Sequence, residues 1–173
     1  MLRDKLKQGM VRKVMSLSKI IYHSPIGDMS LIADEVGLIG AWFQDQKYFE
    51  AGICEASQLQ ETVVLREACQ WLDTYFYQTP PTKADFLSIK GSNFRQKVWR
   101  CLQEIPYGET RSYKEIAEMV NCASAQAVGG AVGHNPFSIF IPCHRVVGSD
   151  GQLTGYAGGL DKKIWLLEHE QGF

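Results

Sequence analysis

The stretch "SYKEIAEMVNCASAQAVGGAVGHN", residues 112–135, decides how the second half of the chain folds. Ser112 can cap a first helix, "YKEIAEMV", and the short polar turn "NCAS" separates it from a second helical segment, "AQAVGGAVGHN". Two short helices joined by a tight turn are typical of a helix-turn-helix. The pattern therefore predicts this motif over residues 112–135.

Two glycines, Gly129 and Gly130, lie inside the second predicted helix. A glycine in a helix interior costs about 1 kcal/mol relative to alanine. The pair therefore indicates that another surface approaches the helix backbone closely. Tight packing of a neighbouring helix and approach to a nucleic-acid backbone or groove both meet that requirement, and the glycines alone leave the choice open.

The elements on either side of this motif differ in kind. Upstream, residues 18–43 contain three short apolar runs separated by the turn signals "SPIGD" and "DEVG", which predicts an antiparallel meander. Residues 61–77 have apolar side chains at helical spacing, and the prolines of "QTPPTKADF" end that helix. Downstream, Asp161 can cap a last helix, "KKIWLLEHE".

These elements predict an α/β (α+β) chain with two domains. Ser92 can cap a helix that runs through Glu104, so the boundary is expected between residues 80 and 92. We expect an N-terminal extension over 1–15, a small α/β domain over 16–88 with the antiparallel meander, and a mainly helical domain over 89–173 that contains the helix-turn-helix.

Composition narrows the class of protein. The 173 residues carry a net charge of −1, so any binding to nucleic acid is expected to be modest or local rather than driven by a strongly basic surface. The cysteines at 54, 69, 101, 122 and 143 are odd in number and form no CxxC pair, which argues against a disulfide framework and a zinc site of close pairs. Free thiols suit the reducing cytoplasm. No apolar run is long enough to span a membrane, and "MLRDKLKQGMVRKVM" lacks the apolar core of a secretory signal.

The chemistry centres on "IPCHRVVGSDGQLTGYAGG", residues 141–159. A thiol reacts as the thiolate, so a reactive Cys143 needs a base or a positive neighbourhood, and His144 and Arg145 follow it directly. Adjacent side chains usually point in different directions, so a bridging water or a tight turn is required. A buried structural cysteine remains the alternative. Glu170 is a candidate partner for His144, although its place near a helix end is also typical of a solvated carboxylate.

"IPCHRVV", preceded by "AVGGAVGHNP" and followed by "GYAGG" and "WLLEHE", resembles the O6-alkylguanine-DNA alkyltransferase family. The resemblance covers residues 17–173 and is strongest from residue 92 onward. The segment "MSLSKIIYHSPIGDMSLIA" is similar to the family's usual opening, so residues 1–14 are expected to be an extra tail and Met15 an alternative start.

The resemblance implies a small α/β domain followed by a winged-helix-like domain, acting as a monomer without a cofactor or metal. It also implies the reaction: the protein approaches double-stranded DNA from the minor groove and flips out an O6-alkylguanine. It then moves the alkyl group irreversibly onto a cysteine. O4-alkylthymine is a further substrate of this kind. Because nothing regenerates the cysteine, each molecule is expected to act once.

Carried over by position, the resemblance makes Cys143 the alkyl acceptor, His144 the group that accepts its proton through a water, and Glu170 the group that holds His144. Tyr113 is expected to donate to the leaving base, and Asn135 to tie the helix-turn-helix to the active-site turn. The residues expected to contact substrate or DNA are Gln126, Ala127, Gly129, Gly130, Arg145, Val146, Tyr156, Ala157 and Gly158.

Three positions depart from the family pattern. Gln126 stands where an arginine is common, Ala157 where a serine is common, and Ser138 where some members have proline. These changes affect the expected rate and substrate range rather than the type of reaction.

Two other functions remain as alternatives. An alkyltransferase-like protein binds alkylated guanine without transfer, but such relatives replace the nucleophile, whereas Cys143 is present. A thiol hydrolase would use Cys143 and His144.

Overall fold

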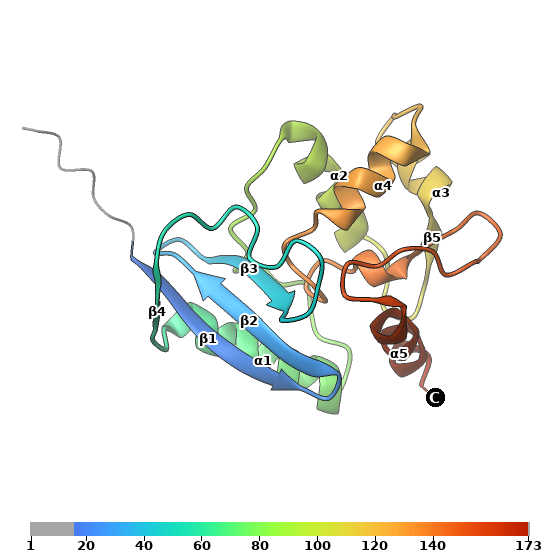
Figure 1. Ribbon diagram of the computed structural model, residues 1–173. Coiled ribbons are helices and arrows are strands. Elements are labelled where there is room, and N and C mark those ends of the chain that lie inside the picture. The colour runs from blue at the N-terminus through green and yellow to red at the C-terminus, as the bar shows by residue number, and fades with distance from the viewer. Residues whose placement is uncertain (1–15, 173) are drawn as a thin grey trace, which may run out of the picture.

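The computed structural model describes residues 16–172, so the expected extension over 1–15 lies outside the described residues. The first half forms a four-stranded sheet in the order β3-β2-β1-β4 (Figure 1). Its strands are β1 (Leu17–Ser24), β2 (Gly27–Ala33), β3 (Leu38–Phe43) and β4 (Ser57–Leu59). The antiparallel pairing of β1, β2 and β3 confirms the predicted meander. Strand β4 pairs parallel to β1 and was not predicted, because it is three residues long.

The sheet is buried on both faces, which explains why its strands read as continuous apolar runs. Helix α1 (Val63–Tyr77) packs across one face, where Met29 and Leu31 join the main core (Figure 1). On the other face, Ile32 and Trp42 form a smaller cluster with Leu17. The alternation of side chains along β2 therefore supplies both layers.

The second half is mainly helical, as predicted. It comprises α2 (Asn93–Gln103), β5 (Arg111–Ser112), α3 (Tyr113–Met119), α4 (Ala125–Gly133), the 3₁₀ turn η1 (Cys143–Arg145), β6 (Val146–Val147) and α5 (Leu160–Gln171). The predicted helix-turn-helix is α3 and α4. Ser112 and Glu115 form a reciprocal capping box at the start of α3, and Ser124 caps α4 through the amide of Ala127.

The expected start of the last helix is wrong. Helix α5 begins at Leu160 with Gly159 as its N-cap, and Asp161 lies inside the first turn rather than capping it. Gly159 has φ +95°, a conformation that residues with a side chain rarely adopt, so the glycine loop can turn into the helix before the polar signal is reached. Asp161 still lies where its charge complements the helix dipole.

The free edge of β3 joins the two halves. Leu38 exchanges backbone hydrogen bonds of 2.9 and 2.8 Å with the connecting segment 86–88. Further along the same strand, the amide of Ala41 donates to the carbonyl of Pro136 at 2.7 Å, and the amide of Ser138 donates to the carbonyl of Ala41 at 3.0 Å. The segment that leads from the helix-turn-helix to Cys143 is thus held as an added strand of the N-terminal sheet.

A substitution at Gly37 tests how tightly β3 and segment 86–88 are joined. A β-carbon at that position would lie 2.5 Å from the backbone carbonyl oxygen of Phe86. We expect Gly37→Ala to lower the free energy of unfolding by about 1–3 kcal/mol, since neither backbone can move without breaking the junction. Urea denaturation measures the change. Gly133→Ala is the matched control: it has open space within 4 Å and should be neutral or stabilising by up to about 1 kcal/mol. Equal urea midpoints for Gly37→Ala and the unmodified protein would contradict a tight junction.

Candidate active site

Cys143 begins the 3₁₀ turn η1, and its side chain is buried. The turn is tight: the amide of Cys143 donates to the carbonyl of Ile141 at 2.7 Å, and that of Arg145 to the carbonyl of Pro142 at 3.0 Å. Burial raises the pKa of the Cys143 thiol, although hydrogen bonding from Asn135 and the charge of Lys163 oppose the rise. The thiol is therefore protonated at neutral pH, and nucleophilic chemistry there needs a base.

Glu170 is the centre of a buried network, so its interpretation as a solvated carboxylate is wrong. One carboxylate oxygen is 2.6 Å from Nε2 of His144 and also accepts from the Tyr75 hydroxyl at 2.7 Å. Arg145 donates to both oxygens, at 2.8 and 2.9 Å, and the amide of Gly108 donates at 3.2 Å. Burial alone would raise the pKa of Glu170, but the charges and hydrogen bonds of His144 and Arg145 outweigh it and hold that pKa far below its usual range. Glu170 is therefore ionised.

The network fixes the protonation of His144. An ionised carboxylate only accepts hydrogen bonds, so Nε2 of His144 carries the hydrogen that faces Glu170. Burial lowers the pKa of His144 and keeps its ring neutral, which leaves a lone pair on Nδ1. Nδ1 is buried and receives no hydrogen bond from residues 16–172. It is free to accept a proton.

The side chains of Arg145 and Val146, two residues that were expected to contact substrate or DNA, face the interior of the protein. Arg145 is buried: besides its bonds to Glu170, its Nη1 donates to the carbonyl of Ile105 at 2.7 Å, and its guanidinium lies 5.6 Å from the centre of the Tyr107 ring. Val146 is fully buried in β6. Because a guanidinium is the best partner for a buried carboxylate, Arg145 supports the fold around Glu170 instead of facing outward.

Lys163 is a site residue that the sequence reasoning missed. It is completely buried, and its Nζ donates to the carbonyls of Val146, Thr154 and Gly155 at 2.6, 2.9 and 3.3 Å. Burial lowers its pKa to about 8, although the nearby Cys143 opposes the shift. A signal was present: Lys163 and Glu170 both fall on the apolar stripe of α5, at helical spacing with Leu166 and Leu167.

Asn135 organises the turn between α4 and the cysteine, in the place expected for it. Its Nδ2 donates to the carbonyl of Ile141 at 2.8 Å, and its Oδ1 accepts from the amide of Phe137 at 2.9 Å. The side chain is buried. The end of the helix-turn-helix is thereby tied to the backbone just before Cys143.

A cavity of about 340 Å³ opens onto Cys143. The sequence-predicted residues that line it are Cys143, Tyr113, Gly129, Gly130, Tyr156 and Ala157, and the further lining residues are Lys47, Tyr48, Val132, Gly133, His134 and Gly155. Gln126 and Ala127 are exposed on α4 but do not line the cavity. Gly158 is buried beside it, where a β-carbon would lie 2.8 Å from the Tyr156 ring and 3.2 Å from Phe43.

The glycines of α4 are not explained by helix packing. A β-carbon on Gly129 would make an ordinary contact of 3.9 Å with the Tyr113 ring, and one on Gly130 would meet nothing within 4 Å among the described residues. Of the two explanations that the sequence left open, approach by a partner outside the chain is therefore the one that these positions favour.

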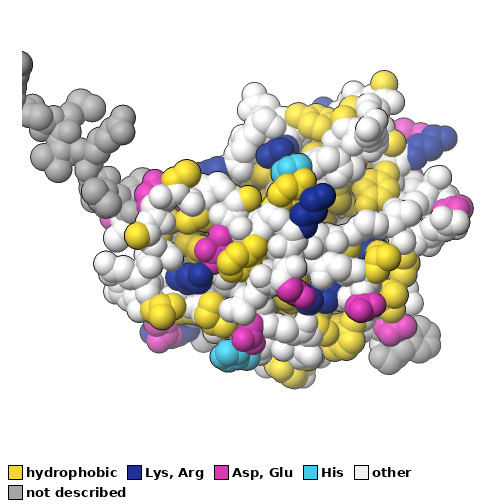
Figure 2. Space-filling model, viewed as in Figure 1, with side chains coloured by type: hydrophobic (Ala, Val, Ile, Leu, Met, Phe, Trp, Pro, Cys, Tyr) yellow, Lys and Arg dark blue, Asp and Glu magenta, His cyan; other side chains and the backbone are white. Residues whose placement is uncertain are grey.

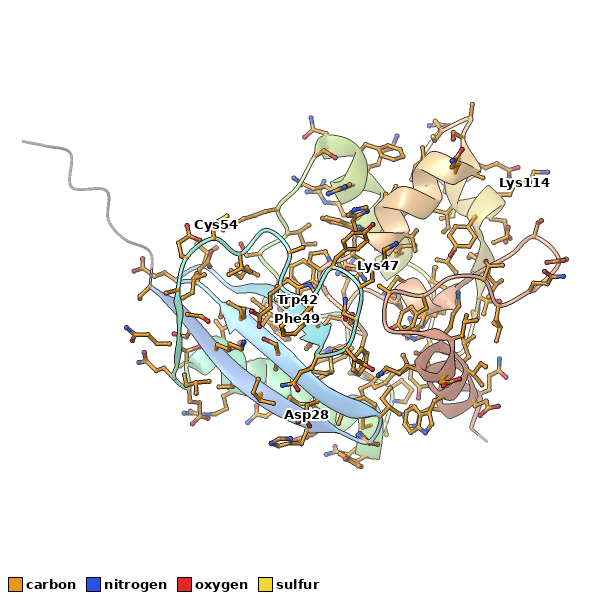
Figure 3. All side chains as sticks on the ribbon, viewed as in Figure 1. Asp28, Trp42, Lys47, Phe49, Cys54 and Lys114 are labelled. Atoms are coloured by element: carbon orange, nitrogen blue, oxygen red, sulfur yellow. The ribbon has the colours of Figure 1, made fainter. Side chains whose placement is uncertain are left out.

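The surface carries mixed charge. Figure 2 shows basic and acidic side chains interspersed over one face, without an extended basic patch. Helix α4 has no basic side chain. Lys114 projects from the neighbouring helix α3, and Lys47, in the N-terminal half, lines the cavity (Figure 3). Within residues 16–172, no group of three or more His, Cys, Asp or Glu side chains is arranged to hold a metal ion. No helix of this part of the chain has the length and apolar character needed to cross a membrane.

Comparisons with known proteins agree along almost the whole chain. Residues 17–86 match the family model "6-O-methylguanine DNA methyltransferase, ribonuclease-like domain", and residues 93–172 match "6-O-methylguanine DNA methyltransferase, DNA binding domain". The methylated-DNA–protein-cysteine methyltransferase of Mycobacterium leprae is 44% identical over 86% of this chain and 88% of its own length. The protein of the same name from Methanosarcina barkeri is also 44% identical, over 87% and 95%.

Solved structures give the same relationship. The O6-methylguanine methyltransferase of Mycobacterium tuberculosis superposes with a TM-score of 0.77 at 39% identity, covering 90% of this chain and 93% of that one. The same tuberculosis protein has also been solved in complex with DNA, with the same TM-score. Because the sequence match extends over most of both chains and the folds coincide, this chain belongs to the 6-O-methylguanine DNA methyltransferase family.

Proposed function

We propose that this protein repairs alkylated DNA directly, by moving the alkyl group of O6-alkylguanine, and also of O4-alkylthymine, onto Sγ of Cys143. The observation that carries the proposal is a buried thiol that lines a cavity beside the helix-turn-helix and is followed in the same turn by a neutral histidine, whose Nε2 is held by an ionised glutamate and whose Nδ1 has no partner among residues 16–172. This arrangement keeps the thiol protonated at rest and places a base nearby that can generate the thiolate.

The reaction begins with transfer of the Cys143 proton to Nδ1 of His144 through a water. The resulting imidazolium is stabilised by Glu170, which is already ionised. The thiolate attacks the alkyl carbon in line, the S–C bond forms, and the C–O bond breaks with its electron pair on the base. Tyr113, which lines the cavity, donates to the leaving base and lowers the barrier. The thioether product has no nearby group to hydrolyse it, so each molecule acts once.

Binding to DNA is assigned to the exposed side of α4, from the minor groove. Gln126 and Ala127 are exposed at the start of this helix, and Gly129 and Gly130 leave its backbone open to close approach. The target base leaves the duplex and enters the cavity, over which Tyr156, Ala157 and Gly158 close. The tuberculosis relative has been solved in complex with DNA, which supports DNA as the partner.

The proposal also covers the domain bounds, the oligomeric state and the cellular location of the protein. We assign the alkyl-acceptor and DNA-binding domain to residues 89–173 and the α/β domain to 16–88. We also propose that the protein acts as a monomer in the cytoplasm, where its five free thiols stay reduced. Neither binding without transfer nor hydrolysis by Cys143 and His144 accounts for a complete acceptor site combined with a DNA-binding helix.

Single-turnover stoichiometry tests the function. Incubation with excess duplex containing O6-methylguanine should add one methyl group to the peptide that carries Cys143, and repair should then stop. Intact-mass and peptide mass spectrometry measure this. Cys143→Ala should bind the same duplex and gain no methyl group, because α4 rather than the thiol makes the DNA contacts. Repeated turnover would identify a hydrolase, and binding without any transfer would identify an alkyltransferase-like protein.

Tyr113→Phe should slow transfer about 10²-fold or more without changing the melting temperature, because it removes one donor to the leaving base. Rapid-quench kinetics with methylated duplex measure the rate. Tyr77→Phe is the matched control, since Tyr77 is exposed on α1 and lies far from the cavity lining. A wild-type rate for Tyr113→Phe would remove this hydroxyl from the reaction.

Gln126→Arg should speed repair in duplex DNA and leave reaction with a free O6-alkylguanine base nearly unchanged. Extrusion costs a few kcal/mol, and a planar guanidinium fills the vacated stack better than an amide does. One added phosphate contact should also steepen the salt dependence of duplex binding by about one unit. Equal acceleration of both substrates would show that position 126 acts on the cavity, and slower duplex repair would show that glutamine is the better residue in this helix.

A further inference from the structure

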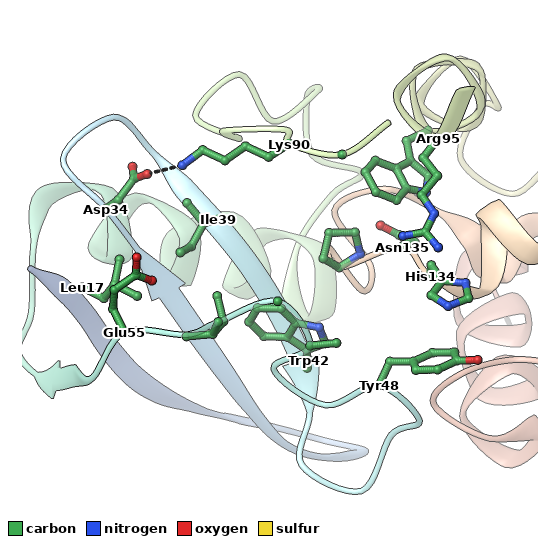
Figure 4. A pocket seen from close by; sticks show the side chains of 16 residues that line it. Leu17, Asp34, Ile39, Trp42, Tyr48, Glu55, Lys90, Arg95, His134 and Asn135 are labelled. Atoms are coloured by element: carbon green, nitrogen blue, oxygen red, sulfur yellow. Dashed lines mark hydrogen bonds and ion pairs between the residues drawn. The ribbon is translucent and has the colours of Figure 1, made fainter. Parts of the chain in front are cut away.

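Tyr48 and His134 stand between two hollows of the molecule. One is the cavity of about 340 Å³ that holds Cys143, and the other is a larger cleft of about 480 Å³ between the two halves of the chain. Both residues line both hollows. Their rings are stacked, with centroids 4.2 Å apart and planes 22° apart (Figure 4).

Tyr48 and His134 form a wall between the two hollows, and backbone contacts hold this wall from both sides. The amide of Lys47, next to Tyr48, donates to the carbonyl of Ala157 in the loop beside Cys143, at 2.9 Å. On the other side, Nδ1 of His134 is 2.7 Å from the carbonyl of Gly130 in α4. The N-terminal domain thus fills the space between the cysteine loop and the end of α4.

The backbone at Tyr48 is strained, which points to a role at the site. Tyr48 has φ +60° and Glu50 has φ +50°, in the left-handed region that residues with side chains rarely occupy. The Glu50 carboxylate is fixed by Lys19 and by the Ser30 hydroxyl. Tyr48 remains 41% exposed, so burial of its ring does not account for the strain. Strain that neighbours maintain is typical of positions that shape a binding site.

The cleft behind the wall suits an apolar or aromatic group. Trp42, Trp99 and Ile39 line it. Its charged lining residues are Asp34 and Lys90, which pair with each other at 2.8 Å, together with Glu55 and Arg95 (Figure 4). A large substituent on the O6 atom would find space there if the wall were absent. With Tyr48 in place, the substituent must fit within the cysteine cavity.

We propose that Tyr48, a residue of the N-terminal domain, determines the largest O6 substituent that this protein accepts, by closing the cysteine cavity against the neighbouring cleft. The inference rests on the proposed function, since it concerns the substrate range of the same cavity. It assigns the N-terminal domain a part in specificity as well as in the fold.

The test compares transfer rates for O6-methylguanine and O6-benzylguanine, both supplied as free bases so that extrusion from DNA plays no part. Tyr48→Gly removes the ring at a backbone conformation that glycine adopts freely. It should raise the ratio of benzyl to methyl transfer about tenfold or more, because steric exclusion from a pocket is relieved. Tyr48→Phe keeps the ring and should keep the wild-type ratio. Intact mass, which distinguishes an added methyl from an added benzyl group, measures both rates.

Phe49→Ala is the matched control, because Phe49 is a neighbouring exposed aromatic residue that lines neither hollow and lies toward the sheet (Figure 3). Thermal melting checks that each variant is folded, and Tyr48→Ala replaces Tyr48→Gly if the glycine variant is not. An unchanged ratio in the folded variant, or an equal rise in Phe49→Ala, would overturn the proposal. Failure of the unmodified protein to accept a methyl group from methylated duplex would instead overturn the proposed function.

Discussion

A single buried carboxylate holds the site and the fold together. Glu170 reaches Tyr75 on α1, Gly108 in the turn before β5, and His144 and Arg145 in η1. Removing a charge from water is costly, and this one is compensated by hydrogen bonds on both oxygens and by a bidentate guanidinium. Loss of a partner from such a pair typically costs about 3–5 kcal/mol, because a charge is left buried and unpaired. The group that sets the protonation state of His144 therefore also links the two halves of the chain.

The position of the thiol follows from the strand edge that supports it. Segment 136–138 is bound to β3 by backbone hydrogen bonds, and Asn135 turns the chain back toward Ile141 just before Cys143. The hydroxyl of Ser138 also donates to Oε1 of Gln46 at 2.8 Å. Sites carried on regular elements are held more accurately than sites on free loops. Here the three-residue turn that carries Cys143 is positioned by a sheet that belongs to the other half of the molecule.

Elements whose structure depends on local sequence patterns could be predicted from the sequence. Serine caps and a polar turn are sufficient for the helix-turn-helix, and turn signals are sufficient for the meander. The sequence does not predict the position of a side chain that is set by a partner from a distant part of the chain. Arg145 lies in a reactive motif and was expected to contact substrate or DNA, but its side chain binds the buried Glu170, which comes from a helix distant in the sequence. Lys163 and Glu170 were detectable as charges on a buried stripe. Tyr48 carries no local signal, because its importance comes from a contact with His134 in the other half.

The β3 edge of the sheet is covered by neighbouring segments of the chain. One side is covered by segments 86–88 and 136–138, and the other ends in β4, a strand of only three residues. Unpaired strand edges are where one chain adds to another, and a net charge of −1 provides almost no repulsion to keep copies apart. A repair protein that is used up by its own reaction protects a cell only in proportion to the number of copies present. Covering the β3 edge removes one place at which those copies could join into aggregates.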